Sequence, residues 1–395
     1  MRRLTLPEYA TRAYYPLPAE HAAALAATGA VRVATDLGGR TMLSASSNVG
    51  VVRAGDVELR VTPKLGIRRL LWLIGHAQDQ AGWRDDDVVH LAAVDDLVSA
   101  VAVSFQAAAN RALAAGVLQG YQVTDEALPV LRGRLREADQ LRGRLGLAVP
   151  LEVRYDDYTI DIPENQLLLA AALRLLRVPA LPGPTHTGLR RLIALLFDVS
   201  LLVPGQRLPA TRDDRLIRRY QPALRLARLV LAGRSIEQPA GPVVASGFLF
   251  NLNKVFEDWL TTALRAALAP YGGLLRAQRP VHLDVDRQID MKPDMVWERA
   301  GRPVAVLDAK YKALRPDQYP HADLYQMLAY CTALGLPAGH LVYAKGEAAP
   351  THHVIRRSGI RVTVWTVDLS SPVPELLEQV SAVASAIAAH AGASE

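Results

Sequence analysis

Residues 291–312 read MKPDMVWERAGRPVAVLDAKYK, and this stretch decides how the C-terminal part of the chain folds. Apolar runs stand on either side of Glu298–Arg302 (ERAGR), which predicts two antiparallel strands joined by a turn. The second run, Val304–Leu307 (VAVL), has no polar interruption, and such a run is typical of a strand buried inside a sheet. The stretch therefore predicts a β-hairpin whose second strand is central.

The hairpin carries two carboxylates and a lysine. Side chains two residues apart on a strand point to one face, so Asp308 and Lys310 emerge together, and the hairpin brings Asp294 beside them. Mg²⁺ prefers oxygen ligands and keeps several waters, so Asp294, Asp308 and the Ala309 carbonyl are candidate ligands, with a phosphate oxygen completing the set. Lys310 would orient the attacking water or offset charge on the phosphate. The alternative is a surface ion pair, but a buried strand makes an unpaired carboxylate costly.

Two predicted helices flank the hairpin and contribute supporting candidates. A helix over about 248–268 has an apolar stripe, and Glu257 lies beside it as a candidate accessory metal ligand. A helix over about 321–334 carries Gln326 and Tyr330 four residues apart, hence on one face, where they could reach the DNA backbone or the lysine. The alternative is that Glu257 is solvated and that Tyr330 caps the core with its hydroxyl outward.

The composition bounds the class of protein. A chain of 395 residues, half of them hydrophobic, is long enough for two or three domains. The single cysteine, Cys331, excludes an internal disulfide and a multi-cysteine zinc site, and with no apolar leader or membrane-length segment it indicates a cytoplasmic protein. The net charge of +6 fits a nucleic-acid partner, but arginine-rich usage makes that inference weak.

The pattern along the chain predicts a multidomain α/β and α+β fold. Residues 1–90 are a mixed β/α region, with a strand at Val57–Val61 and a helix at Ile67–Gln78. Residues 91–240 are mainly helical and arginine-rich, although Leu151–Arg154 is a strand before a loop at Tyr155–Glu164. Residues 241–380 alternate helix and strand, and 381–395 form an Ala/Ser-rich tail that is predicted to be a last, fraying helix.

The order Glu257, Asp294, Asp308-x-Lys310, Gln326, Tyr330 resembles the PD-(D/E)xK nuclease superfamily. More specifically, the chain resembles the McrC family, the nuclease subunits of McrBC modification-dependent restriction systems. Three further segments carry that resemblance: Gly50–Lys64 (GVVRAGDVELRVTPK), Leu131–Arg134 (LRGR) and Tyr155–Leu169 (YDDYTIDIPENQLLL). It covers about residues 45–370.

The resemblance implies a DNA endonuclease subunit that depends on Mg²⁺, with Mn²⁺ as the alternative ion. It also implies a McrB-like AAA+ GTPase as the motor that the chain stimulates, and double-stranded DNA carrying modified cytosine as the substrate. The N-terminal part would dock on the motor. The chain agrees with this division because it contains no G-x-x-x-x-G-K-[ST] phosphate-binding loop, so it is not itself the motor.

Three alternatives stay open at this point. The chain could be a non-cutting partner that binds DNA or regulates the GTPase, or a stand-alone nuclease of the same superfamily. Two arginine groups could contact DNA phosphates or form a solvated face, and the Leu131–Leu135 segment could equally hold a structural arginine pair that needs Gly133 for a turn. His352-His353 has no third ligand at useful spacing and is interpreted as a loop pair. The arginine groups are Arg132, Arg134, Arg136, Arg142, Arg144 and Arg207, Arg212, Arg215, Arg218, Arg219, Arg225, Arg228.

Overall fold

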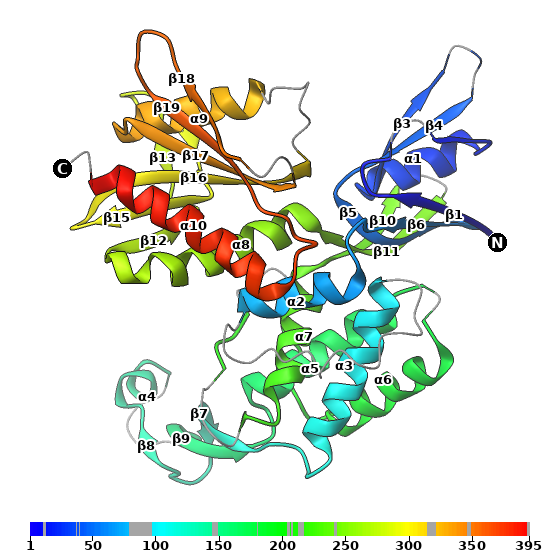
Figure 1. Ribbon diagram of the computed structural model, residues 1–395. Coiled ribbons are helices and arrows are strands. Elements are labelled where there is room, and N and C mark those ends of the chain that lie inside the picture. The colour runs from blue at the N-terminus through cyan, green and yellow to red at the C-terminus, as the bar shows by residue number, and fades with distance from the viewer. Residues whose placement is uncertain are drawn as a thin grey trace. The chain divides into compact units, whose positions relative to one another are not determined.

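The computed structural model describes residues 1–10, 13–36, 38, 40–78, 97–143, 149–179, 181–203, 206, 208–211, 217–240, 243–313, 321–345 and 349–392. The chain forms two compact units (Figure 1). Unit 1 combines Met1–Leu97 with Ser235–Glu395, and unit 2 is Val98–Arg234. The middle of the chain is therefore inserted between the two parts of unit 1.

The N-terminal part of unit 1 is built on a five-stranded sheet in the order β1-β6-β5-β11-β10. Its strands are β1 (Arg2–Pro7), β6 (Val57–Thr62), β5 (Asn48–Ala54), β11 (Val243–Asn251) and β10 (Arg234–Ala240). Strand β11 pairs with β5 although the two are about two hundred residues apart, so segments from before and after the insertion pair in this sheet. A smaller sheet, β2-β4-β3, and helix α1 (Ala19–Ala27) lie in the same part of the chain; the strands are Ala13–Tyr15, Thr41–Ala45 and Val31–Thr35.

The C-terminal part of unit 1 is a six-stranded mixed sheet in the order β12-β15-β16-β17-β19-β18. The strands are Leu274–Ala277, Met295–Arg299, Arg302–Ala313, Ala338–Lys345, Arg361–Thr366 and Thr351–Val354. As predicted, β15 and β16 form an antiparallel hairpin, and β16 is an interior strand. β16, β17 and β19 run parallel to one another.

Helices cover both faces of this sheet. On one face, Tyr311 of β16 packs on Phe256 of α8 (Leu252–Leu268), and α10 (Val373–Gly392) packs on α8. On the other face, Val306 shares a core with Met327 and Cys331 of α9 (His321–Leu334). Residues of opposite parity on one strand thus face different helices. Helix α2 (Ile67–Gln78) joins the N-terminal part to α8, where the Thr262 hydroxyl donates to the Ala77 carbonyl at 3.0 Å.

Unit 2 combines a helical cluster with a three-stranded antiparallel sheet, β7-β9-β8. The strands are Gly120–Leu128, Leu151–Thr159 and Arg134–Leu135, and the short helix α4 (Glu137–Gly143) follows β8. The helices of the cluster are α3 (Leu97–Leu113), α5 (Pro163–Leu176), α6 (Gly183–Leu195) and α7 (Gln221–Ala232).

Several local predictions are corrected by the structure. The loop expected from Tyr155 is strand β9 as far as Thr159, because those residues complete the ladder with β7. The helix expected from residue 248 begins at Leu252, since 243–251 form β11. The strand expected over 289–298 is divided into β14 (Asp290–Met291) and β15, because Pro293 lacks a donor for the ladder. The His352-His353 pair lies on edge strand β18 rather than in a loop.

Candidate functional site

The two aspartates of the hairpin lie side by side at the centre of the C-terminal sheet. The register pairs Met295 with Leu307, which places Asp294 next to Asp308 on the face toward α9. Asp294 Oδ2 accepts a hydrogen bond from the Ala309 N–H at 2.8 Å. Asp308 is 2% exposed. The strand backbone therefore holds Asp308 inside the protein and Asp294 in a partly buried position beside it.

Burial changes the acidity of this pair. Burial first, and then the charge of Asp308, raise the pKa of Asp294 to about 7. Burial also raises the pKa of Asp308, although the Lys310 ammonium opposes that shift. Two adjacent carboxylates, one buried and one partly buried, cannot both ionise cheaply, so the pair favours a compensating cation.

Lys310 supplies part of that compensation and is fixed by three partners. Its ammonium forms an ion pair with Asp308 and donates to Gln326 Oε1 at 2.9 Å. It also lies 3.9 Å from Asp323 Oδ1. Asp308 and Lys310 thus lie side by side on one face of β16, as strand parity predicts.

Gln326 and Tyr330 connect α9 to the site in the predicted i, i+4 relation. The Gln326 Nε2 donates to the Tyr330 hydroxyl at 2.7 Å, and that hydroxyl donates to the Lys292 carbonyl at 3.4 Å. Burial, followed by the charge of Asp308, raises the pKa of Tyr330 to about 12. The Tyr330 hydroxyl therefore stays protonated and, with Gln326, holds the lysine in place.

Glu257 stands on α8 at the edge of the same site. Its side chain is 14% exposed, and Oε1 accepts from Gln278 Nε2 at 2.6 Å and from Lys254 Nζ at 3.0 Å. Its charge contributes to the raised pKa of Asp294. Glu257 is thus near Asp294 and partly shielded rather than on an open helix face.

Sequence patterns missed a third aspartate, Asp323 in the first turn of α9. Asp323 is buried, accepts from the Tyr343 hydroxyl, and lies 2.7 Å from Lys312 Nζ. It therefore joins Lys310 and Lys312 through one carboxylate. Two signals could have found it: Asp323 precedes Gln326 by three residues, on one helix face, and Lys312 follows Lys310 by two.

The donor set suits a hard cation with few protein ligands. Asp294, Asp308 and the Ala309 carbonyl offer oxygen, which Mg²⁺ and Mn²⁺ accept while keeping waters or substrate oxygens. Within the described ranges, no three acidic, histidine or cysteine side chains are close enough to hold a metal by themselves. A metal bound here would therefore depend on two carboxylates, backbone oxygen and solvent or substrate.

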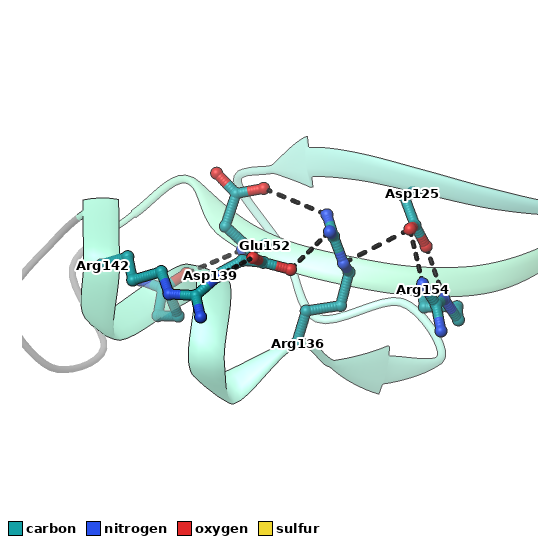
Figure 2. Close-up of polar contacts among 7 residues, drawn as sticks. Asp125, Arg136, Asp139, Arg142, Glu152 and Arg154 are labelled. Atoms are coloured by element: carbon teal, nitrogen blue, oxygen red, sulfur yellow. Dashed lines mark hydrogen bonds and ion pairs between the residues drawn. The ribbon is translucent and has the colours of Figure 1, made fainter.

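The first arginine group is part of an ion-pair network in unit 2. Figure 2 shows Arg136 between Asp125, Asp139 and Glu152, while Arg154 forms two hydrogen bonds of 2.6 Å with Asp125. Arg132 donates to Asp157 at 2.8 Å. These guanidinium groups neutralise neighbouring carboxylates within the sheet.

The backbone of the same segment explains why position 133 is a glycine. Its φ is +69°, and a Cβ built there would lie 2.4 Å from the Arg154 carbonyl oxygen. The turn that carries Arg132 and Arg134 past β9 therefore requires glycine, which agrees with the structural interpretation of this segment.

The second arginine group is only partly described, because Arg207, Arg212 and Arg215, like Arg144 of the first group, lie outside the described residues. Among the others, Arg225 is buried and Arg228 donates to Thr211. Arg219 donates to the Gly116 carbonyl at 2.9 Å, while Arg218 is exposed. This group is therefore not one uniform solvated face.

Comparison with known proteins gives the fold first. The chain is similar to a chain of the refined half-complex from the tetradecameric assembly of Thermococcus gammatolerans McrB AAA+ hexamers with bound McrC. The TM-score is 0.57 and the identity 16%, over 98% of this chain and 100% of that chain. A chain of the T. gammatolerans McrBC cryo-EM structure is similar at TM-score 0.40 and 18% identity, over 69% of this chain and 90% of that chain.

A family model described as "McrBC 5-methylcytosine restriction system component" matches residues 43–344. The chain belongs to this family, which confirms the resemblance to McrC seen in its motifs. None of the curated proteins matches the sequence. In the part of the chain that the structure describes, no helix is long and apolar enough to cross a membrane.

Proposed function

We propose that this chain is the Mg²⁺-dependent DNA endonuclease subunit of a GTP-driven restriction complex directed at modified cytosine. The observation that carries the proposal is the Asp294–Asp308 pair beside Lys310, with Asp308 buried and Asp294 partly buried, in a chain of a 5-methylcytosine restriction family. The order of helices and strands around that pair supports a PD-(D/E)xK nuclease domain in the C-terminal part of unit 1.

The residues divide into ligands and positioning groups. Asp294, Asp308 and the Ala309 carbonyl would hold the ion, with Glu257 as an accessory ligand. When bound, Mg²⁺ polarises the scissile phosphate and lowers the pKa of a bound water. Lys310, fixed by Asp308 and Gln326, offsets negative charge on the phosphate or orients the water. Tyr330 positions Gln326 and does not itself transfer a proton.

A separate AAA+ GTPase would supply the energy of GTP hydrolysis and recognise the modified base. The similar solved assembly contains McrC bound to McrB AAA+ hexamers, which supports a McrB-like partner for this chain. The lack of a phosphate-binding loop in the sequence supports the same division of labour. Double-stranded DNA carrying modified cytosine is the proposed substrate.

The test combines cleavage with GTP hydrolysis. The cognate motor, GTP, Mg²⁺ and modified DNA are incubated with wild-type chain or with Asp308→Ala. We expect cleavage to fall at least about 100-fold, as for loss of a main electrostatic contributor, while GTPase stimulation persists. Retained cleavage by Asp308→Ala contradicts the assignment. Equal GTPase stimulation with no cleavage by either protein would favour the alternative, a non-cutting partner that regulates the GTPase.

A further inference from the structure

A pocket of about 200 Å³ lies beside the end of β16, just beyond Lys310. Residues from five separated segments of unit 1 line it. Those that carry the argument are Glu8, Tyr9, Lys64, Lys312, Lys345 and Asp368. None of the functional assignments made above uses this pocket.

The distribution of lysine marks the pocket as unusual. Of the 45 basic residues in the chain, six are lysines. Three of them, Lys64, Lys312 and Lys345, line the pocket. The other three are at or next to the carboxylate site: Lys254 contacts Glu257, Lys292 accepts a hydrogen bond from Tyr330 through its carbonyl, and Lys310 contacts Asp308. Lysine is a compact point charge that binds phosphate without a fixed geometry, unlike the arginine used elsewhere.

Asp323 couples the pocket to the carboxylate site. Its two oxygens lie 3.9 Å from Lys310 Nζ and 2.7 Å from Lys312 Nζ. Residues two apart on a strand are separated by roughly 6.6 Å. One strand of DNA advances about 3.4 Å per nucleotide along the helix axis. A strand with one phosphate at Lys310 would therefore present another within one or two nucleotides of Lys312.

The N-terminal wall of the pocket is fixed by hydrogen bonds to β16. Buried Glu8 accepts from the Lys64 N–H at 2.8 Å and from the Tyr311 hydroxyl at 3.1 Å. The Tyr9 hydroxyl donates to the Tyr311 carbonyl at 2.8 Å, and Tyr9 as a whole residue is 38% exposed. An exposed, immobilised aromatic ring offers a sequence-independent stacking surface for a base or sugar.

Each acidic side chain of the lining accepts hydrogen bonds through one oxygen. Glu8 Oε1 makes the two contacts above, and Asp368 Oδ1 accepts from the Ser370 N–H and hydroxyl at 2.9 and 2.6 Å. Lys64 and Lys345 are exposed, and the Lys312 side chain is 47% exposed. Although Asp323 is buried, its partner Lys312 is about half exposed, so a phosphate can approach the ammonium from the solvent side.

We propose that this pocket is a second phosphate subsite, which binds the sugar-phosphate backbone of the DNA strand next to the scissile phosphate. The inference rests on the proposed nuclease function and adds the residues that bind the backbone of its DNA substrate. The contacts are electrostatic and do not read bases, so they position DNA of any sequence. Lys64, from the Gly50–Lys64 motif of the N-terminal part, thereby becomes a DNA-contacting residue.

The test measures equilibrium binding of duplex DNA to the full chain in EDTA, over a series of salt concentrations. EDTA separates binding from cleavage. In the variant Lys64→Gln/Lys345→Gln, the slope of log affinity against log salt should decrease by about two, since each lost phosphate contact removes roughly 0.9. The charge-conserving variant Lys64→Arg/Lys345→Arg should keep the wild-type slope.

Arg32→Gln/Arg265→Gln is the matched control, because it removes the same charge from exposed positions of unit 1 that do not line the pocket. The inference is overturned if the wild-type chain does not bind DNA, or if the glutamine variant keeps the wild-type salt slope. It is also overturned if the control lowers the salt slope as much as the glutamine variant does, or if the arginine variant lowers it. GTP alone tests a free nucleotide as ligand. Tighter binding of GTP than of DNA, lost in the glutamine variant, would also overturn the DNA subsite.

The same titration on Asp308→Asn separates the two proposals. This substitution should leave the salt slope unchanged while it removes cleavage. If Asp308→Asn retains cleavage while Lys64→Gln/Lys345→Gln changes the salt slope, the catalytic assignment is rejected and the subsite is kept. If Asp308→Asn loses cleavage while the lysine variant keeps the wild-type slope, only the subsite is rejected.

Discussion

Unit 1 and unit 2 each contain a cluster of acidic and basic side chains, but the two clusters have opposite electrostatics. In unit 2, hydrogen bonds from Arg154 lower the pKa of Asp125, and arginine surrounds the neighbouring carboxylates. In unit 1, burial and the proximity of Asp308 raise the pKa of Asp294 to about 7. The unit 2 network is internally compensated, whereas the unit 1 site retains negative charge that a cation can balance. A carboxyl pKa that is shifted strongly from its ordinary value is typical of functional sites.

The largest effect that would sharpen this comparison is expected from Lys310→Met. The substitution keeps much of the side-chain volume but removes the ammonium that contacts Asp308 and Gln326. We expect single-turnover cleavage of modified DNA to fall by at least about 100-fold, with GTPase stimulation unchanged. Arg154→Met in unit 2 provides the comparison, since it disrupts a compensated network. A similar loss of single-turnover cleavage in both variants, with both folded and able to stimulate the motor, would remove the distinction between the clusters.

A smaller effect is expected in the pH dependence of stability of the metal-free chain. The pKa of Asp294 is higher in the folded protein than in the unfolded chain, so the folded state binds more protons between about pH 4 and pH 7. Stability from this group is therefore fully present below about pH 4 and is lost as pH rises through about 7. Asp294→Asn should flatten this decline, by roughly 1–4 kcal/mol at neutral pH, in urea unfolding followed across pH.

The control for that measurement is Asp125→Asn. The folded-state pKa of Asp125 is lowered, so its contribution is present above the unfolded pKa and is lost as pH falls. The two substitutions should consequently change the pH profile in opposite directions. Profiles that change in the same direction would contradict the contrast between the units.

The smallest effect is expected from Gly133→Ala in unit 2. The positive φ and the close Arg154 carbonyl oppose a Cβ, so we expect destabilisation by about 1–3 kcal/mol. Gly143→Ala is the matched control, because a Cβ there meets nothing within 4 Å. Thermal unfolding of the two variants compares them directly, and equal melting temperatures would show that the LRGR turn does not need glycine.

The parts of the site predicted from sequence depend on local geometry. Strand parity placed Asp308 with Lys310, and the ERAGR turn placed Asp294 beside them, because both relations act within one hairpin. The helix over 321–334 was predicted at its observed bounds, since its apolar spacing and the glycine after it are local signals. The catalytic roles of these residues stay predictions until the variants are assayed.

The parts that were missed depend on distant partners. The last residues of β11, 248–251, are predicted from sequence as the start of a helix, because the partner strand β5 lies about two hundred residues earlier. Beyond Arg154, the polar sequence of β9 predicts a loop. These residues form a strand because they pair with β7, and not because they are buried. Asp323 acquires its role only when α9 packs beside β16, and the pocket needs segments from both ends of unit 1.

The most direct test of the central claim is calorimetric titration of the purified chain with Mg²⁺, repeated with Mn²⁺, near neutral pH in buffers of different ionisation enthalpy. If the Asp294–Asp308 pair is a metal site, wild type binds the ion and releases protons, because a carboxyl group with a pKa of about 7 must ionise to become a ligand. Asp308→Asn should lose both the binding and the proton release. Equal binding heats and equal proton release in wild type and Asp308→Asn would contradict the account.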